Sequence, residues 1–308
     1  MNFVVPHRAR DRAVPQPCAV CAATAKRSAC SHCESVWYCD SACQRKDWPT
    51  HRKICKARGA EKFRRDLELA EAGNLERQNN IGCCYFQGLR VARDLSKAVY
   101  WWKRAADAGA PEAQHSLALC FMNGEGTAVD LVEAVRLLQL AATAGNASAQ
   151  TTLGVAYMKG LGGLKEDAAT AVHWFRKASE QGYANALLHL GCALYYGDGI
   201  PVDEKEGLRL LQVAAESGLP AAQFSLGLVL SGGELAPWDG RKETMLDMFE
   251  KSSQAIAART EGMRWIKRAA SMGHKEAQLY MAQPGMAHAA DEILAAHEAA
   301  VEFAKKLG

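Results

Sequence analysis

The sequence predicts an all-α protein in which an array of helix–turn–helix repeats follows a small cysteine-rich module. Two observations predict the array: an alanine-rich phrase ending in glycine recurs along the chain, and a second phrase recurs inside each unit. A third observation, seven cysteines between residues 18 and 55, sets the first segment apart. The 308 residues are 49% apolar and 23% charged, which is the composition of a folded chain and not of a disordered one.

The repeat is visible in its glycines, which lie 36, 37, 36 and 55 residues apart. They are Gly109, Gly145, Gly182, Gly218 and Gly273, with an earlier echo at Gly73. The second phrase comprises Ile81-Gly82, Leu117-Ala118, Leu153-Gly154, Leu190-Gly191 and Leu226-Gly227. Each unit is therefore predicted to be a first helix, a glycine-rich turn, a second helix and a glycine cap.

The second helix of each unit has its own signals. A capping aspartate precedes it in four units: Asp94, Asp130, Asp167 and Asp203. One large apolar residue recurs in the same slot and should be buried: Trp102, Leu138, Phe175, Leu211 and Ile266. The small residues between these positions should let neighbouring helices approach closely, since glycine inside a helix otherwise costs up to about 1 kcal/mol.

The fifth unit departs from this rule. The interval from its turn glycine to the small residue of the second helix grows from 10 or 11 residues to 29, which places an insert near 234–258. We expect either a tolerated loop with one extra helix folded on the array or a contact element specific to this protein. Residues 284–308 are predicted to form a C-terminal capping helix, because the last unit of such an array needs a polar outer face.

Eight candidate metal ligands lie in four pairs near the start of the chain. The pairs are Cys18 and Cys21, Cys30 and Cys33, Cys39 and Cys43, and His51 and Cys55. A two-residue gap lets two thiolates reach one metal from a tight turn, and a three-residue gap puts both ligands on one helical face. Tetrahedral Zn²⁺ takes four such ligands, so four pairs predict two structural ions with no open position for catalysis. Disulfides are the alternative, but the paired spacing and the lack of a secretory segment favour metal.

The run Tyr38-Cys39-x3-Cys43-Gln44-x3-Trp48-x2-His51-x3-Cys55, preceded by two Cys-x2-Cys pairs, resembles the MYND zinc finger. The resemblance covers residues 18–55 and implies an interleaved arrangement of ligands. One zinc ion would be bound by Cys18, Cys21, Cys39 and Cys43, and the other by Cys30, Cys33, His51 and Cys55. A module of about 40 residues buries too little apolar surface to fold unaided, so we expect it to be unfolded without metal.

The same resemblance implies a peptide-binding groove. MYND fingers of transcriptional regulators bind short proline-rich peptides, and the matching groove positions here are Ser31, Gln44 and Trp48. An exposed tryptophan offers a flat apolar platform to a polyproline helix, while the two polar side chains can hydrogen-bond its free backbone. The alternative is that Trp48 packs over the second metal site and Gln44 caps a helix.

The repeated phrases resemble the Sel-one-like repeat, a relative of the tetratricopeptide repeat, over about residues 73–283. The resemblance implies a right-handed α-solenoid with a concave face that binds partner proteins. Outside the finger and the array we expect a flexible N-terminal tail over residues 1–17 and a connecting helix over residues 56–72.

Signals of catalysis are weak, and we expect no enzyme. Gly124-Glu125-Gly126 and Gly197-Asp198-Gly199 recur at the repeat period with no preceding strand, so they are turns and not phosphate-binding loops. Four cysteines lie beside the small-residue slot and are predicted to be core residues: Cys83, Cys84, Cys120 and Cys192. Three histidines are not spaced as a ligand set: His115, His173 and His189.

These features predict a zinc-binding adaptor for other proteins. The alternative is a nucleic-acid-binding regulator, because residues 1–60 hold eleven Lys or Arg against four Asp or Glu. A phosphate-binding surface usually has a denser basic stripe with more aromatic residues, so nucleic acid is not the expected partner. No stretch approaches the ~18 uncharged apolar residues of a membrane span, and no apolar secretory segment is visible. We expect a cytoplasmic or nuclear protein with zinc as its cofactor.

Overall fold

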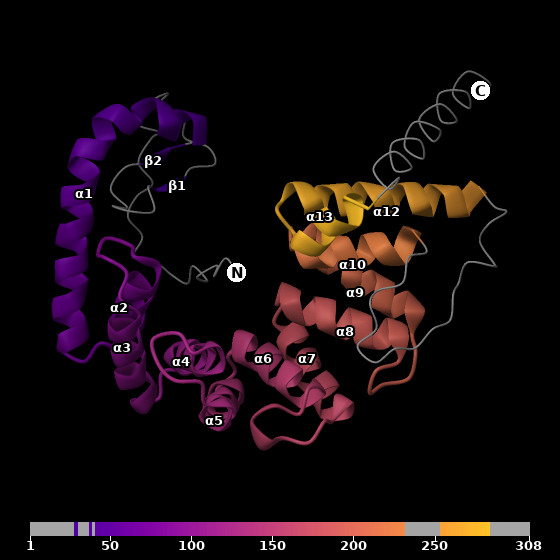
Figure 1. Cartoon of the computed structure of the whole chain (residues 1–308), viewed down its shortest axis with the longest axis horizontal. Helices are drawn as coiled ribbons and strands as arrows, with labels where there is room; N and C mark the ends of the chain where they lie inside the picture. The colour runs from indigo at the N-terminus through magenta and orange to yellow at the C-terminus, as the bar shows by residue number, and fades with distance from the viewer. Residues whose placement is uncertain (1–27, 30–36, 39–40, 232–252, 284–308) are drawn as a thin grey trace. The chain divides into compact units, whose positions relative to one another are not determined.

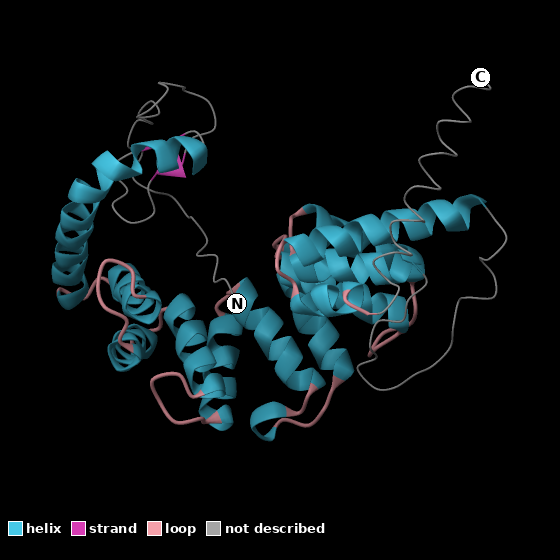
Figure 2. Ribbon diagram, turned by 45° about the horizontal axis from the view of Figure 1, so that its top comes forward, coloured by secondary structure: helices cyan, strands magenta, loops and turns pink. Residues whose placement is uncertain are grey.

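The computed structural model describes residues 28–29, 37–38, 41–231 and 253–283, and these residues form helices almost throughout (Figures 1 and 2). The predicted N-terminal tail, most of the insert near 234–258 and the predicted C-terminal capping helix lie outside the described residues. The chain divides into two compact units, Met1–Leu137 and Leu138–Gly308, which are described separately. None of the helices in the described ranges is long and apolar enough to cross a bilayer.

The first unit begins with two short strands and one long helix. Strand β1 (Ser28–Ala29) pairs antiparallel with β2 (Trp37–Tyr38), so that Ala29 faces Trp37. Helix α1 (Ser41–Glu71) follows, and the predicted connecting helix forms its second half. Then come α2 (Leu75–Gln87), α3 (Leu95–Asp107) and α4 (Pro111–Asn123), while α5 (Leu131–Thr143) spans the boundary between the units.

The second unit continues the same alternation of first and second helices (Figure 1). Its elements are α6 (Ala147–Met158), the 3₁₀ turn η1 (Leu161–Gly163), α7 (Ala168–Glu180), α8 (Ala184–Tyr196), α9 (Glu204–Glu216), α10 (Pro220–Ser231), α12 (Ser253–Ser271) and α13 (Lys275–Met281). Phe175, Leu211 and Leu226 belong to a buried apolar core in this unit. All five residues predicted for the repeated core slot are buried.

The predicted helix caps are confirmed. Each of the four aspartates accepts a hydrogen bond at Oδ1 from the backbone N–H three residues on, at 2.9 to 3.0 Å. Turn glycines Gly88, Gly124 and Gly197 have φ between 69° and 80°, the left-handed conformation that glycine adopts without strain. The local signals and the final fold therefore agree where first helices end and where second helices begin.

A glutamine contact that the sequence did not predict recurs between consecutive units. The side chain in the first helix donates from Nε2 to the backbone oxygen of the residue eight positions earlier, which lies in the preceding second helix. The pairs are Gln78 with Ala70, Gln114 with Ala106, Gln150 with Ala142, Gln223 with Ala215, and Gln278 with Ala270, at 2.9 to 3.3 Å. All but Gln278 are buried. Each of these oxygens also accepts from the N–H of the glycine three residues on, so the glutamine occupies the second lone pair and fixes one helix against the next.

Replacing Gln150 by alanine should destabilise the array by about 2 kcal/mol. Both ends of its amide are hydrogen-bonded, because Nε2 donates to Ala142 O at 3.0 Å and Oε1 accepts from Gln181 Nε2 at 2.9 Å. Removing it loses both hydrogen bonds and leaves the space of a buried side chain empty, although the Ala142 oxygen keeps the bond from the Gly145 N–H. Urea denaturation measures the effect, and Gln278→Ala is the control, because the same bond is exposed there and its loss should cost well under half as much. Equal effects would mean that burial of the bond does not matter.

Candidate metal centre

The finger has a described part in which two strands lie against the start of a long helix. The β1–β2 pair brings residues 28–29 beside residues 37–38, and β2 contacts α1. Residues 30–36, which contain the predicted ligands Cys30 and Cys33, connect the two strands. The chain enters α1 at Ser41, three residues after β2 ends. The strand pair thus holds the two ends of the segment that contains Cys30 and Cys33. Its strand β2 contacts α1, the helix that contains His51 and Cys55.

Two of the predicted ligands are described, and both are buried. His51 and Cys55 are each 2% exposed and lie four residues apart in α1, so they occupy adjacent turns of one helical face. An imidazole nitrogen and a thiolate sulfur are donors that zinc takes in structural sites. Burial of this pair on one helical face fits two ligands of a structural zinc site.

The other predicted site residues are placed only in part. Cys43, Gln44 and Trp48 lie in α1, but their side chains are outside the described residues. The remaining positions are wholly outside them: Cys18, Cys21, Cys30, Ser31, Cys33 and Cys39. Within the described ranges no three His, Cys, Asp or Glu residues gather as a metal site. The pairing of ligands and the count of two ions therefore remain predictions.

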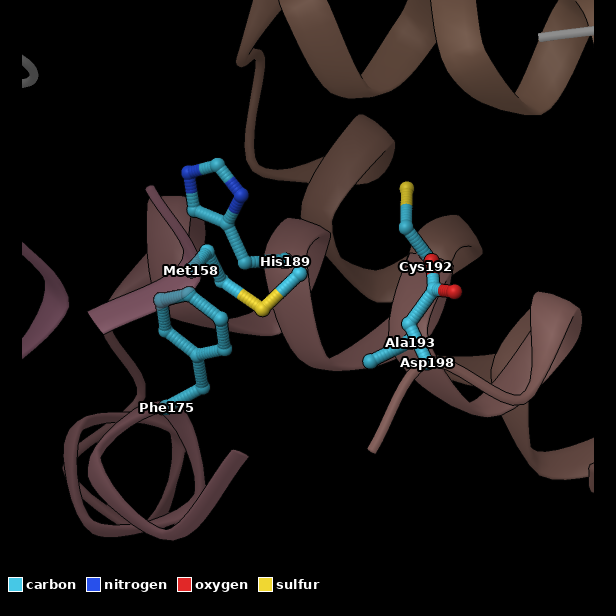
Figure 3. A pocket seen from close by; sticks show the side chains of 6 residues that line it. All are labelled: Met158, Phe175, His189, Cys192, Ala193 and Asp198. Carbon is cyan, nitrogen blue, oxygen red and sulfur yellow. The ribbon is translucent and has the colours of Figure 1, made fainter. Parts of the chain in front are cut away.

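A hollow in the second unit is lined by a cysteine and a histidine that lie apart from each other (Figure 3). Met158, Phe175, His189, Cys192, Ala193 and Asp198 line it. The His189 ring stacks on Phe175 at 4.9 Å between centroids, and in Figure 3 Cys192 lies apart from that ring. Burial, helped by the nearby Asp198 carboxylate, raises the pKa of the Cys192 thiol to about 12. Burial lowers the pKa of His189 to about 4, and the positive charge of Lys159 contributes to the same shift.

The Cys192 thiol and the His189 imidazole are therefore both neutral near pH 7, whereas nucleophilic catalysis by cysteine requires the thiolate. Burial likewise raises the pKa of Cys83 to about 11 and of Cys120 to about 12. Burial also lowers the pKa of His115 to about 4. These side chains behave as small or aromatic core residues, as the sequence predicted for the cysteines.

The fold and the site define an α-helical repeat protein with an N-terminal zinc-binding finger. Among protein families, the MYND finger matches residues 18–55. The Sel1 repeat matches residues 78–109, 111–146, 147–183, 184–219 and 256–274. Because these repeats cover more than half of the 308 residues, the chain belongs to the Sel1 repeat family.

Two curated relatives resemble the chain over the finger alone. The histone-lysine N-methyltransferase ASHR1 of Arabidopsis thaliana is 48% identical over 40 residues, which are 13% of this chain and 8% of that protein. The zinc finger MYND domain-containing protein 10 homolog of Drosophila melanogaster is 50% identical over 38 residues, which are 12% of this chain and 8% of that protein. The chain thus spans less than a tenth of either relative, and the likeness covers only the finger.

Solved structures resemble the repeat array. A protective antigen of uropathogenic Escherichia coli strains that displays an SLR fold is 25% identical, with a TM-score of 0.53. The alignment covers 80% of this chain and 53% of that one. A Sel1 repeat protein from Oxalobacter formigenes is 27% identical with a TM-score of 0.50, over 66% of this chain and 76% of that one. The predicted all-α repeat fold is confirmed.

Proposed function

We propose that this protein is a non-catalytic adaptor whose zinc finger binds a proline-rich peptide and whose repeat array holds a second protein partner. Two zinc ions, bound by the ligand sets that the sequence predicts, fold the finger. Its thiolate ligands require a reducing compartment, which means cytoplasm or nucleus. MYND fingers and Sel1 repeats are both modules of protein–protein interaction, and the chain carries both.

One observation carries the peptide-binding part of the proposal. Helix α1 contains Gln44 and Trp48 one turn apart, followed by the buried ligands His51 and Cys55 in the next two turns. A peptide that touches both groove positions would therefore lie along the metal-anchored start of this helix. A backbone that is fixed before binding loses little entropy on association, as does a polyproline ligand.

The non-catalytic part is supported by the chemistry of the repeats. Their cysteine thiols and the two half-buried histidines are neutral at physiological pH, because desolvation shifts each pKa away from 7. The match to a methyltransferase covers 40 residues at the finger, so it lends no catalytic domain to this chain.

Replacing Trp48 by alanine should weaken binding of a proline-rich peptide at least about tenfold, which corresponds to ~1.4 kcal/mol. The reason is loss of the flat apolar platform. Fluorescence polarisation with a labelled peptide on the full chain measures the affinity, and elemental analysis verifies that the metal content is unchanged. Trp48→Phe is the matched control, since it keeps a flat ring and should retain most of the affinity. Unchanged affinity in a fully metal-loaded Trp48→Ala protein would leave Trp48 with a packing role only.

A further inference from the structure

The second half of α1 occupies the place of a second helix in a repeat. Gln78 donates to the backbone oxygen of Ala70 at 2.9 Å, just as Gln114 donates to that of Ala106. The turn that follows α1 also matches the turn that follows α3, because the Asn74 N–H donates to Leu69 O just as the Ala110 N–H donates to Ala105 O. The matched Sel1 repeats begin only at residue 78, so α1 supplies half a repeat beyond them.

This half-repeat packs as a repeat helix does. Ala70 is fully buried with Ile81 and Trp101, and Phe63 and Leu67 pack against the same cluster. The Phe63 and Tyr85 rings meet edge to face at 5.5 Å. In this way α1 covers the apolar surface that the first matched repeat would otherwise expose.

Polar contacts hold the same end of the helix. Arg77 pairs with Asp66 at 3.2 Å, and both side chains are largely shielded from solvent. The Arg104 guanidinium donates to Glu71 O at 3.0 Å while it lies over the Trp101 ring. The last turn of α1 is thus tied to both α2 and α3.

The first half of the same helix belongs to the finger. His51 and Cys55 lie in α1, and Cys55 precedes Phe63 by eight residues, about two turns. The side chains between them are mostly exposed, including Ala57, Arg58, Ala60 and Glu61. That stretch has little packing of its own, so its helical order depends on the anchors at its two ends.

We propose that the finger is the N-terminal cap of the repeat array, and that metal bound by the finger stabilises the first repeat through α1. Helices shorter than about 12 to 15 residues are marginal in water. Without the anchor at His51 and Cys55, only the residues from Phe63 to Glu71 would keep tertiary contacts, which is fewer than that length. Fraying of α1 then exposes the cluster around Ile81 and Trp101. Peptide binding plays no part in this inference.

Hydrogen exchange with mass spectrometry on the full chain tests the coupling. Stripping the metal with a chelator should accelerate amide exchange in α2 and α3 at least about tenfold, while α8 and α10 in the second unit stay unchanged. Cys55→Ser should reproduce the effect in part, since it removes one of four ligands of a site. Unchanged exchange in α2 after metal removal would overturn the proposal.

A proline in the exposed middle of α1 tests whether the coupling between the finger and the first repeat runs through this helix. Ala60→Pro interrupts the helix at the stretch that links the two anchors. It should leave the metal bound, raise exchange in α2, and make that exchange insensitive to the chelator, whereas Ala60→Ser should behave as the unaltered chain does. Persistent chelator sensitivity in Ala60→Pro would show that the coupling does not run through α1. The chelator experiment on the unaltered chain decides the proposal even if this variant fails to fold.

Discussion

Removing the metal should unfold the finger completely while the second compact unit keeps its helical structure. The finger cannot bury enough apolar surface to fold alone, and structural zinc contributes roughly 10–16 kcal/mol of apparent binding free energy at neutral pH. The array from α6 onward has its own core around Phe175, Leu211 and Leu226, which needs no metal. Limited proteolysis and hydrogen exchange are each measured before and after chelation. Both should locate the loss of structure in the residues before 75 and in α2 and α3, which are coupled to the finger.

A cysteine outside the finger supplies the control for this expected result. Cys192→Ala should retain the full metal content, because Cys192 lies in the wall of a hollow in the second unit, beside Ala193 and Asp198. Cys55→Ser should lose metal, since Cys55 is a buried ligand candidate four residues after His51. A finger that resists proteolysis equally well with and without metal would contradict the zinc-dependent fold.

Replacing Gly227 by alanine should destabilise the second unit by about 3 kcal/mol. A methyl group there would lie 2.5 Å from Ile266 Cγ1 and 2.7 Å from the backbone oxygen of Gly262, so α10 and α12 would have to separate. In an ordinary helix interior the same change gains up to ~1 kcal/mol, because alanine has the better helix propensity. Overpacking against backbone outweighs that gain, since backbone cannot rotate away as a side chain can.

Gly191→Ala provides the matched comparison. Its new methyl group would meet Leu211 Cγ at 3.0 Å and the Gly207 oxygen at 3.1 Å, which are longer and therefore milder contacts than those at Gly227. Urea denaturation should therefore rank the unaltered chain as most stable, Gly191→Ala next and Gly227→Ala last. A Gly227→Ala protein as stable as the unaltered chain would mean that α10 and α12 do not approach as closely as described.

The sequence predicts the repeat array well because its signals are local and recur. Capping aspartates such as Asp94 act within one helical turn, and a core residue such as Leu211 recurs at the same slot in each unit. The glutamine contacts could not be predicted in the same way. A glutamine such as Gln150 is usually an exposed residue, and although it recurs eight residues after the second alanine of the repeated phrase, that recurrence alone does not reveal a bond to a backbone oxygen.

The extent of α1 was also beyond the sequence. The sequence predicts a connecting helix over residues 56–72 but does not show that it continues the helix of the finger, since Pro49 and Gly59 disfavour a helix interior. Packing of Phe63, Leu67 and Ala70 on the first repeat, together with the buried pair His51 and Cys55, outweighs both residues. Tertiary contacts at the two ends of this helix override its local propensity.

The count of zinc ions in the purified full-length chain tests the central claim most directly. Elemental analysis should find two zinc ions per chain, because four ligand pairs fill two tetrahedral sites. It should find a substoichiometric second ion in Cys55→Ser, since that change leaves only three of the four proposed ligands for one site. One ion or none in the unaltered chain would contradict the two-site finger and the adaptor built on it.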